Sequence, residues 1–425
     1  MGWRANLRPR RWVWMVGVVV VVALIASGGV AARALNNRSG DGHVRHGLSI
    51  APATASAAAK THKGRRPKPT TTSASTTTTT SVSTTTTVSA SSTSTTLPPA
   101  TPGSDVKIPL AGFGDMLVDQ GRGRIYISGG KGSSGIVVTD LQGNSLRTLE
   151  GIAPGAAGMT LSPDGTKVYV AASDSDGITI IDASTYDIGW YWTGTSLGEP
   201  TCPRDVAVAS GQLWFSWGCD GGPVGIGRVD PETRAHELHA YTADTKVTSP
   251  PLLATLPSQP NMLIAGESGT NPASLFRFEA TPTGLEQRVW RRTDGGSVLQ
   301  LAVTPDGSQV IVPSGYPYYH PVLRTSDLTE VHRYPTTAYP NAAAVRPDGV
   351  VAAGINGAYD EDVYIFEPGG STPIATYEFG HLPGQETWAH TLVNGGLAWA
   401  GDRIYAITEQ LSEPDNLTLR IRVVG

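Results

Sequence analysis

The aromatic segment Tyr316-Pro-Tyr-Tyr-His320 is the first place where this sequence offers binding chemistry. Tyr316, Tyr318 and Tyr319 each combine a flat apolar face with a hydroxyl group, and His320 adds a titratable ring. Such side chains suit contacts with a sugar or a peptide. Packing of the same rings against a neighbouring element is the competing interpretation, and the sequence leaves both open.

Acidic side chains form the second candidate. The segment Tyr359-Asp-Glu-Asp362 supplies Asp360, Glu361 and Asp362. Comparable loops carry Asp174, Asp176, Asp220, Glu267 and Glu413. Several converging carboxylates could hold Ca²⁺, but no single segment has the spacing of a calcium loop. The sequence therefore favours a solvated acidic rim and predicts neither a metal nor a cofactor.

A third candidate is the segment from His381 to His390. His381, Glu386 and His390 could ligate a metal or transfer protons, and Trp388 offers a flat platform. Because no helix is expected to hold these side chains on one face, their spacing carries little information. They remain ligand-binding candidates, and no residue is assigned a catalytic role.

Cys202 and Cys219 are the only cysteines in the chain. If Ser210-Gly211 is a two-residue hairpin loop, Ala209 faces Gln212. Counting outward then places Cys202 opposite Cys219 at a non-hydrogen-bonded pair, where strands approach closely enough for a disulfide. The spacing predicts this disulfide; two free buried thiols are the alternative.

The elements that must position these segments are repeated strands. The clearest copy runs Leu161-Ser-Pro-Asp-Gly-Thr-Lys-Val-Tyr-Val-Ala171 and continues Ile178-Thr-Ile-Ile-Asp182. The Pro-Asp-Gly turn recurs in Val303-Thr-Pro-Asp-Gly307 and Val345-Arg-Pro-Asp-Gly349. Seven such units start about 42 to 53 residues apart between positions 105 and 425. This pattern predicts an all-β fold, a seven-bladed β-propeller.

The two ends of the repeat region predict how the ring closes. The last unit supplies three strands, near Gly396–Ala400, Arg403–Thr408 and Asn416–Val424. Val106–Leu110, before the first inner strand, can supply the fourth. Pairing the two ends in one blade would hide open sheet edges.

The copy at Leu161–Ala171 and Ile178–Thr185 resembles the YVTN-type propeller repeat of bacterial and archaeal surface proteins. That family includes relatives of the quinoprotein amine dehydrogenase beta chain and lactonase-like propellers. The resemblance is close over this unit and loose over the other six. It implies a seven-bladed ring, and it implies no single function, because related propellers serve as enzymes and as adhesive modules.

The N-terminal part predicts export. Trp12–Ala32 is an uncharged, apolar run long enough to cross a bilayer. Arg4, Arg8, Arg10 and Arg11 precede it and favour a cytoplasmic N-terminus at positions 1–11. We expect a signal anchor at 12–32; a signal peptide cleaved near Ala32-Arg33-Ala34, giving a secreted protein, is the alternative.

Positions 33–104 are expected to form a disordered stalk, because Ser, Thr and Pro dominate from about position 49 onward. Residues 105–425 hold 20 Lys and Arg against 35 Asp and Glu, a formal charge of −15 within the whole-chain value of −4. So acidic a domain is a poor partner for nucleic acid.

Together these features predict a membrane-anchored extracytoplasmic propeller that acts as a binding or scaffolding module at the cell envelope. Its expected partner is a glycan, a peptide or an envelope protein, bound on the face where loops converge on the channel mouth. The alternative is a hydrolase or lyase of the lactonase-like kind, using acidic and histidine side chains at that mouth.

Overall fold

The structure, a computed structural model, describes residues 105–194, 200–230, 233, 235–240, 247–356, 361–379, 390–410 and 413–423. Every regular element in these ranges is a β-strand. Within them there is no helix of the length and apolarity that a membrane crossing requires. The predicted signal anchor at 12–32 and the stalk at 33–104 lie outside the described residues.

In the described ranges the strands form seven four-stranded antiparallel sheets, called blades below. The first blade comprises β2 (Met116–Asp119), β3 (Arg124–Ser128), β4 (Ile136–Asp140) and β5 (Ser145–Leu149). The second comprises β6 (Ala156–Leu161), β7 (Lys167–Ala172), β8 (Gly177–Asp182) and β9 (Ile188–Trp192). The third comprises β10 (Pro203–Ala209), β11 (Gln212–Gly218), β12 (Val224–Val229) and β13 (His236–Ala240). The fourth comprises β14 (Pro251–Leu256), β15 (Gln259–Glu267), β16 (Ser274–Thr281) and β17 (Gly284–Arg292).

The remaining blades follow the same order. The fifth comprises β18 (Ala302–Val303), β19 (Gln309–Ile311), β20 (His320–Arg324) and β21 (Glu330–Tyr334). The sixth comprises β22 (Pro340–Val345), β23 (Val351–Ile355), β24 (Val363–Phe366) and β25 (Ala375–Tyr377). The closing blade comprises β26 (His390–Ala400), β27 (Arg403–Gln410), β28 (Glu413–Val423) and β1 (Asp105–Lys107).

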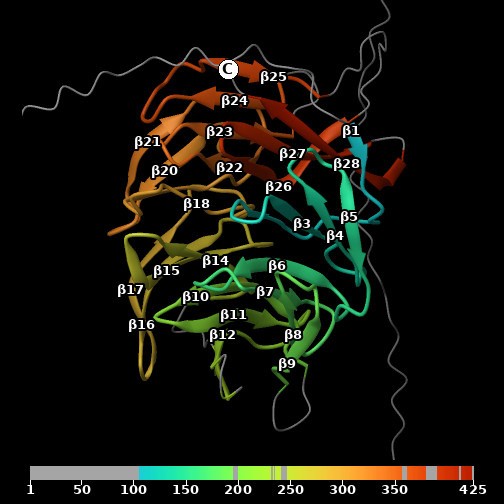
Figure 1. Ribbon diagram of the computed structural model, residues 1–425. Coiled ribbons are helices and arrows are strands. Elements are labelled where there is room, and N and C mark those ends of the chain that lie inside the picture. The colour runs from blue at the N-terminus through green and yellow to red at the C-terminus, as the bar shows by residue number, and fades with distance from the viewer. Residues whose placement is uncertain are drawn as a thin grey trace, which may run out of the picture. The chain divides into compact units, whose positions relative to one another are not determined.

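The first strand of each blade faces a common centre (Figure 1). These inner strands contact one another in the order β2, β6, β10, β14, β18, β22 and β26, and β26 contacts β2 again. The all-β propeller predicted from the repeats is therefore confirmed.

The second blade shows how the sequence specifies a single unit. Its turn Pro163-Asp164-Gly165 joins β6 to β7, and Gly165 has a φ of 67°, a conformation that glycine adopts without a steric penalty. Asp164 Oδ1 accepts hydrogen bonds from Ser162 Oγ at 2.6 Å and from the Thr166 N–H at 3.0 Å. These contacts lie within the hairpin itself and do not depend on another blade.

The core lies between neighbouring blades. Strand β7 buries Val168 and Val170 against Tyr126 and Ile136 of the first blade. On its other face, Tyr169 and Ala171 pack with Phe215 of the third blade. Because both faces are covered, β7 carries a continuous apolar run instead of an alternation of apolar and polar residues.

The ends of the propeller close as predicted. Strand β1 pairs with β28, with Val106 opposite Leu419 (Figure 1). Ile108 and Leu110 follow β1 and are buried in one cluster with Tyr405 and Ile407 of β27. Both the backbone and the apolar side chains therefore join the two ends of the domain.

The predicted disulfide between Cys202 and Cys219 is also confirmed, with Cα atoms 5.2 Å apart. Ala209 pairs with Gln212, as the hairpin count requires. The register shifts by one residue between Pro203 and Asp205. Proline has no N–H to give to the ladder, which accounts for an irregularity at this point.

Candidate functional site

Two sets of loops gather on the face of the propeller that we call the channel-mouth face. One set joins the second strand of a blade to the third, and the other joins the last strand of a blade to the next inner strand. The Pro-Asp-Gly turns lie at the opposite strand ends. Three features of the channel-mouth face have potential for binding: a central cavity, an ion pair beside it, and a group of exposed tyrosines.

The central cavity has a volume of about 550 Å³. It is lined by residues at the beginnings of inner strands, including Asp115, Gly158 and Asp205, and by loop residues such as Lys131 and Asn394. The volume falls in the range typical of small-molecule sites. The cavity is therefore large enough for a ligand of modest size.

Asp115 and Asp205 occupy equivalent places in the first and third blades. Asp115 Oδ1 accepts the N–H of Met116 at 2.8 Å, and its Oδ2 accepts the N–H of Met159 in β6 at 2.8 Å. Each aspartate thereby links its own inner strand to that of the following blade.

Asp205 repeats this arrangement one blade further on. It accepts the N–H of Val206 at 2.8 Å and that of Leu253 in β14 at 2.7 Å. Burial raises the pKa of Asp115 to about 6, because the two main-chain donors offset only part of the lost hydration. Burial, and after it the negative charge of Asp115, raise the pKa of Asp205 to about 8.

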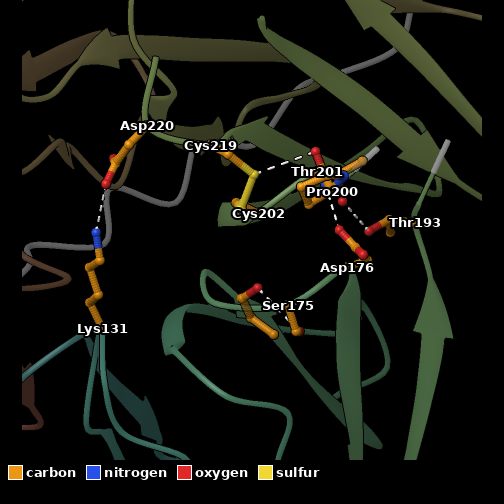
Figure 2. Close-up of a disulfide and its surroundings, with 10 residues drawn as sticks. Lys131, Ser175, Asp176, Thr193, Pro200, Thr201, Cys202, Cys219 and Asp220 are labelled. Carbon is orange, nitrogen blue, oxygen red and sulfur yellow. Dashed lines mark hydrogen bonds and ion pairs between the residues drawn. A yellow bond between two sulfur atoms is a disulfide. The ribbon is translucent and has the colours of Figure 1, made fainter. Parts of the chain in front are cut away.

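Lys131 and Asp220 form an ion pair beside the cavity, with Nζ 2.9 Å from Oδ2 (Figure 2). Lys131 belongs to the β3–β4 loop and Asp220 to the β11–β12 loop, so the pair joins the first blade to the third. The hydrogen bond from Lys131 and the charges of Lys131 and Arg204 hold the pKa of Asp220 below its usual value. Both side chains are exposed, and such pairs contribute little to stability.

The disulfide lies in the same part of the face, because Cys219 directly precedes Asp220 (Figure 2). Asp176 Oδ1 accepts the N–H of Thr201 at 2.6 Å next to it. Thr201 also shares a hydroxyl hydrogen bond of 2.8 Å with Thr193. The disulfide thus ties the loop that carries Asp220 to Cys202, just before β10. Hydrogen bonds from Asp176 and Thr193 hold the neighbouring residue Thr201.

The predicted aromatic segment forms part of a group of exposed rings. Tyr316, Tyr318 and Tyr339 are 54, 50 and 55% exposed. The ring centroids of Tyr316 and Tyr318 are 5.7 Å apart and those of Tyr318 and Tyr339 are 5.6 Å apart, both with edge-to-face geometry. A hydrogen bond with Tyr339 raises the pKa of Tyr318. We call these three residues the tyrosine cluster.

The backbone beneath the tyrosine cluster is well supported. The N–H of Gly315 donates to the carbonyl of Pro340 at 2.7 Å, which joins the loop of Tyr316 and Tyr318 to the start of β22, next to Tyr339. The ring of Tyr316 lies on Gly295, where a Cβ atom would be only 2.7 Å from Cδ1 of the ring. These two contacts hold the Tyr316–Tyr318 loop against the start of β22 and hold the Tyr316 ring against Gly295.

Tyr319 points into a different environment from the cluster. Its ring lies 4.2 Å from the guanidinium carbon of Arg333, and Arg333 forms an ion pair with Glu330. Burial raises the pKa of Tyr319. The residue lines a separate pocket of about 270 Å³ together with Arg292 and Pro317.

His320 lies in the core at the start of β20 and is fully buried. Its Nε2 is 3.0 Å from the carbonyl oxygen of Ala342, and its Nδ1 is 3.2 Å from Thr336 Oγ1. Burial lowers the pKa of His320 to about 4, so the ring is neutral at pH 7. A neutral ring that donates from Nε2 and accepts at Nδ1 satisfies both contacts. In this arrangement His320 supports the loop and does not face solvent.

The described members of the predicted acidic rim contact separate protein groups. Asp174 accepts the N–H of Gly132 at 2.6 Å. Glu267 is buried and accepts hydrogen bonds from Thr248, Ser249 and Ser274.

Two carboxylates of the acidic loop of the sixth blade lie in the described residues, those of Glu361 and Asp362. Asp362 is buried and accepts the N–H of Phe379, whereas Glu361 is partly exposed. In the described ranges, no group of three or more His, Cys, Asp or Glu side chains is arranged to hold a metal ion.

Several candidates lie outside the described residues: Asp360, His381, Glu386 and Trp388, and the side chains of His390 and Glu413. The predicted grouping of His381, Glu386 and His390 therefore stays a prediction.

Sequence reasoning missed Asp115, Asp205 and Tyr339. Asp115 directly precedes β2 and Asp205 lies in the first half of β10, and both make the same two main-chain contacts two repeats apart, so an alignment of the repeats could have found them. Tyr339 stands alone in the sequence, and only the fold brings it to Tyr318.

Comparisons with known proteins identify the fold. No protein-family model matches this chain, and no curated protein matches it in sequence. Among solved structures, the chain is similar to the β-propeller domain of Cps50 (Swd1) from Myceliophteria thermophila, with a TM-score of 0.54 and 13% sequence identity. The similarity covers 75% of this chain and 98% of that one. At this identity it shows the propeller fold and nothing about function.

Proposed function

We propose that this protein is a carbohydrate-binding module of the cell envelope. In this proposal a seven-bladed, YVTN-type propeller is anchored in the membrane by residues 12–32 and held outside the cell on the 33–104 stalk. The tyrosine cluster of Tyr316, Tyr318 and Tyr339 is the observation that carries the proposal.

The chemistry of the tyrosine cluster supports a polyhydroxylated ligand. Large aromatic side chains are normally buried, so three half-exposed rings in mutual contact mark an interaction surface. About half of each ring is exposed and can contact the C–H groups of a sugar, and the hydroxyl groups can exchange hydrogen bonds with sugar hydroxyls. The cluster itself carries no charge, which suits a neutral polysaccharide better than a charged one.

Two features support an exported location. The disulfide between Cys202 and Cys219 would persist in an oxidising compartment. The apolar run at 12–32, preceded by four arginines, is typical of a signal anchor with its N-terminus inside.

Binding of the full-length protein to purified envelope polysaccharides tests the proposal. We expect binding by the wild type, at least tenfold weaker binding by Tyr318→Ala, and intermediate binding by Tyr318→Phe, which removes only the hydroxyl. Losing a stacking contact of about 1.4 kcal/mol corresponds to a tenfold change.

Ile374→Ala is the matched control. Ile374 is 52% exposed and lies in the β24–β25 turn, at the strand ends opposite the tyrosine cluster. Equal binding by Tyr318→Ala and Ile374→Ala would contradict the proposal. Binding of proline-rich peptides in place of polysaccharides would contradict it as well, because such peptides are the other common ligand of exposed aromatic surfaces.

A further inference from the structure

The pocket beside Tyr319 has features that the tyrosine cluster does not use. It is lined by residues of the fourth and fifth blades and has a volume of about 270 Å³. Much of its lining is apolar and comes from one cluster of side chains that the two blades share: Leu275, Val312, Leu323 and Leu328. Tyr319 and Pro321 line it as well. The pocket can therefore hold the apolar part of a small molecule.

Arg291 brings a positive charge to this pocket. It stands opposite Leu275 in the pairing of β16 with β17, and residues directly opposite each other share a face of the sheet. Its side chain therefore lies on the face that is turned to the fifth blade. Arg291 Nε donates to the carbonyl oxygen of Asp327 in that blade at 3.2 Å. This bond holds the guanidinium in place, while its terminal NH2 groups have no partner among the described contacts.

Arg292 lines the pocket too, but its side chain belongs to the other face of β17. Successive side chains of a strand point to opposite faces, so Arg292 shares a face with Trp290. Trp290 packs against the apolar cluster between the third and fourth blades. Arg291 is therefore the arginine that is placed to meet a ligand in the pocket.

Another arginine balances the acidic side chains of the pocket. Asp294 and Glu330 are the acidic residues in its described lining. Glu330 forms an ion pair with Arg333, whose guanidinium carbon lies 4.2 Å from the centroid of the Tyr319 ring. The hydrogen bond to Glu330 and, to a smaller extent, the charge of Asp294 raise the pKa of Arg333. Arg291 is left without a carboxylate among its described contacts, at the edge of an apolar pocket.

We propose that this pocket binds a small organic carboxylate, with its charged group on Arg291 and its apolar part against Tyr319 and Leu323. A guanidinium presents paired donors that match the two oxygens of a carboxylate. The flat face of Tyr319 suits an aromatic or other ring in the apolar part.

The charges around the pocket favour a carboxylate over a phosphate ester. A phosphate monoester carries about 1.5 to 2 negative charges near pH 7. Asp294 and Glu330 line the same pocket and repel every added negative charge. One negative charge is the amount that Arg291 can balance.

Calorimetric titration of the full-length protein with phenylacetate tests this site, with 2-phenylethanol as the neutral counterpart and phenyl phosphate as the dianion. We expect phenylacetate to bind at least about tenfold more tightly than either compound, because its contact with Arg291 is charge-assisted. Added salt should weaken its binding. Equal binding of phenylacetate and 2-phenylethanol, or no binding of phenylacetate, would overturn the proposal. So would phenyl phosphate binding as tightly as phenylacetate.

Variants then locate the site. Arg291→Gln should weaken phenylacetate binding at least about tenfold. Arg291→Lys keeps the charge but loses the paired donors, and its affinity should be intermediate. Arg288→Gln is the matched control, because Arg288 lies in the same strand, forms ion pairs with Glu279 and Glu286, and is not among the residues that line the pocket. It should bind phenylacetate like the wild type. Thermal unfolding of each variant shows whether it is folded.

Unchanged binding by a folded Arg291→Gln protein would reject the site, and so would equal losses in Arg291→Gln and Arg288→Gln. Arg291→Gln should bind envelope polysaccharides like the wild type. Failure of this site and failure of the polysaccharide proposal can therefore be told apart.

Discussion

Asp115 and Asp205 flank one inner strand, β6, and the negative charge of Asp115 raises the pKa of Asp205. The two residues are 90 positions apart in the sequence and make equivalent main-chain contacts to the following blade. They therefore serve two purposes at once, since they join inner strands and place titratable groups in the central cavity.

The first prediction is that Asp205 makes the propeller less stable as the pH rises. Its pKa is about 8 in the folded state against an ordinary value of 3.8, so the folded protein binds a proton that the unfolded chain releases. The resulting stabilisation is complete below pH 4 and is lost as the pH rises through about 8. From pH 6.5 to pH 8.5 we expect the free energy of unfolding to fall by about 2 kcal/mol.

Denaturant unfolding at these two pH values measures the effect, with Asp205→Asn as the comparison. This range minimises two other contributions. Asp115, with a pKa of about 6, is largely ionised by pH 6.5, and His320, with a pKa of about 4, acts with the opposite sign between about pH 6.5 and pH 4. An unchanged slope in Asp205→Asn would show that other groups cause the pH dependence.

The second prediction concerns the disulfide. Cys202 and Cys219 are 17 positions apart, and cross-linking a loop of this size typically stabilises a protein by about 3 kcal/mol. We expect a reductant to lower the free energy of unfolding by about that amount. The double variant Cys202→Ser/Cys219→Ser should show the same loss without reductant. Because the chain has no other cysteine, reductant should not affect this variant, and a response from it would point to an artefact.

The third prediction tests closure of the ring. Ile108 and Leu110 are buried against Tyr405 and Ile407, so Ile108→Ala and Leu110→Ala should each lower the free energy of unfolding by about 2–5 kcal/mol. Leu146→Ala is the control, because Leu146 is 51% exposed and its truncation should cost less than about 0.5 kcal/mol. Chemical denaturation of the three variants makes the comparison. Similar losses in all three would mean that the N-terminal segment contributes little to closure.

Local sequence predicts much of the fold because the contacts that specify it are local. The Pro163-Asp164-Gly165 turn fixes the β6–β7 hairpin through bonds between residues a few positions apart. The Cys202–Cys219 pair follows from counting along one hairpin, and even the shift at Pro203 left the two residues close enough to bond. Closure by β1 could be predicted because only one blade lacked a strand.

The candidate sites were less accessible to prediction from the sequence. Tyr316 and Tyr318 were identified by residue type, but the sequence could not show that Tyr339 of another loop completes their cluster. Nor could it show that His320, two residues beyond Tyr318, turns inward to bond Ala342 and Thr336. Whether a side chain in a loop faces solvent depends on what the neighbouring blade places beside it.

The sequence by itself determined the repeated strands, their turns, the single disulfide and the pairing of the two ends. Only the tertiary structure decided that Asp115, Gly158 and Asp205, from three different blades, meet at one cavity. The physical reason is that hairpins are specified by contacts between near neighbours in the chain. The content of a central cavity depends instead on which inner strands pack side by side, and packing of whole blades sets that order.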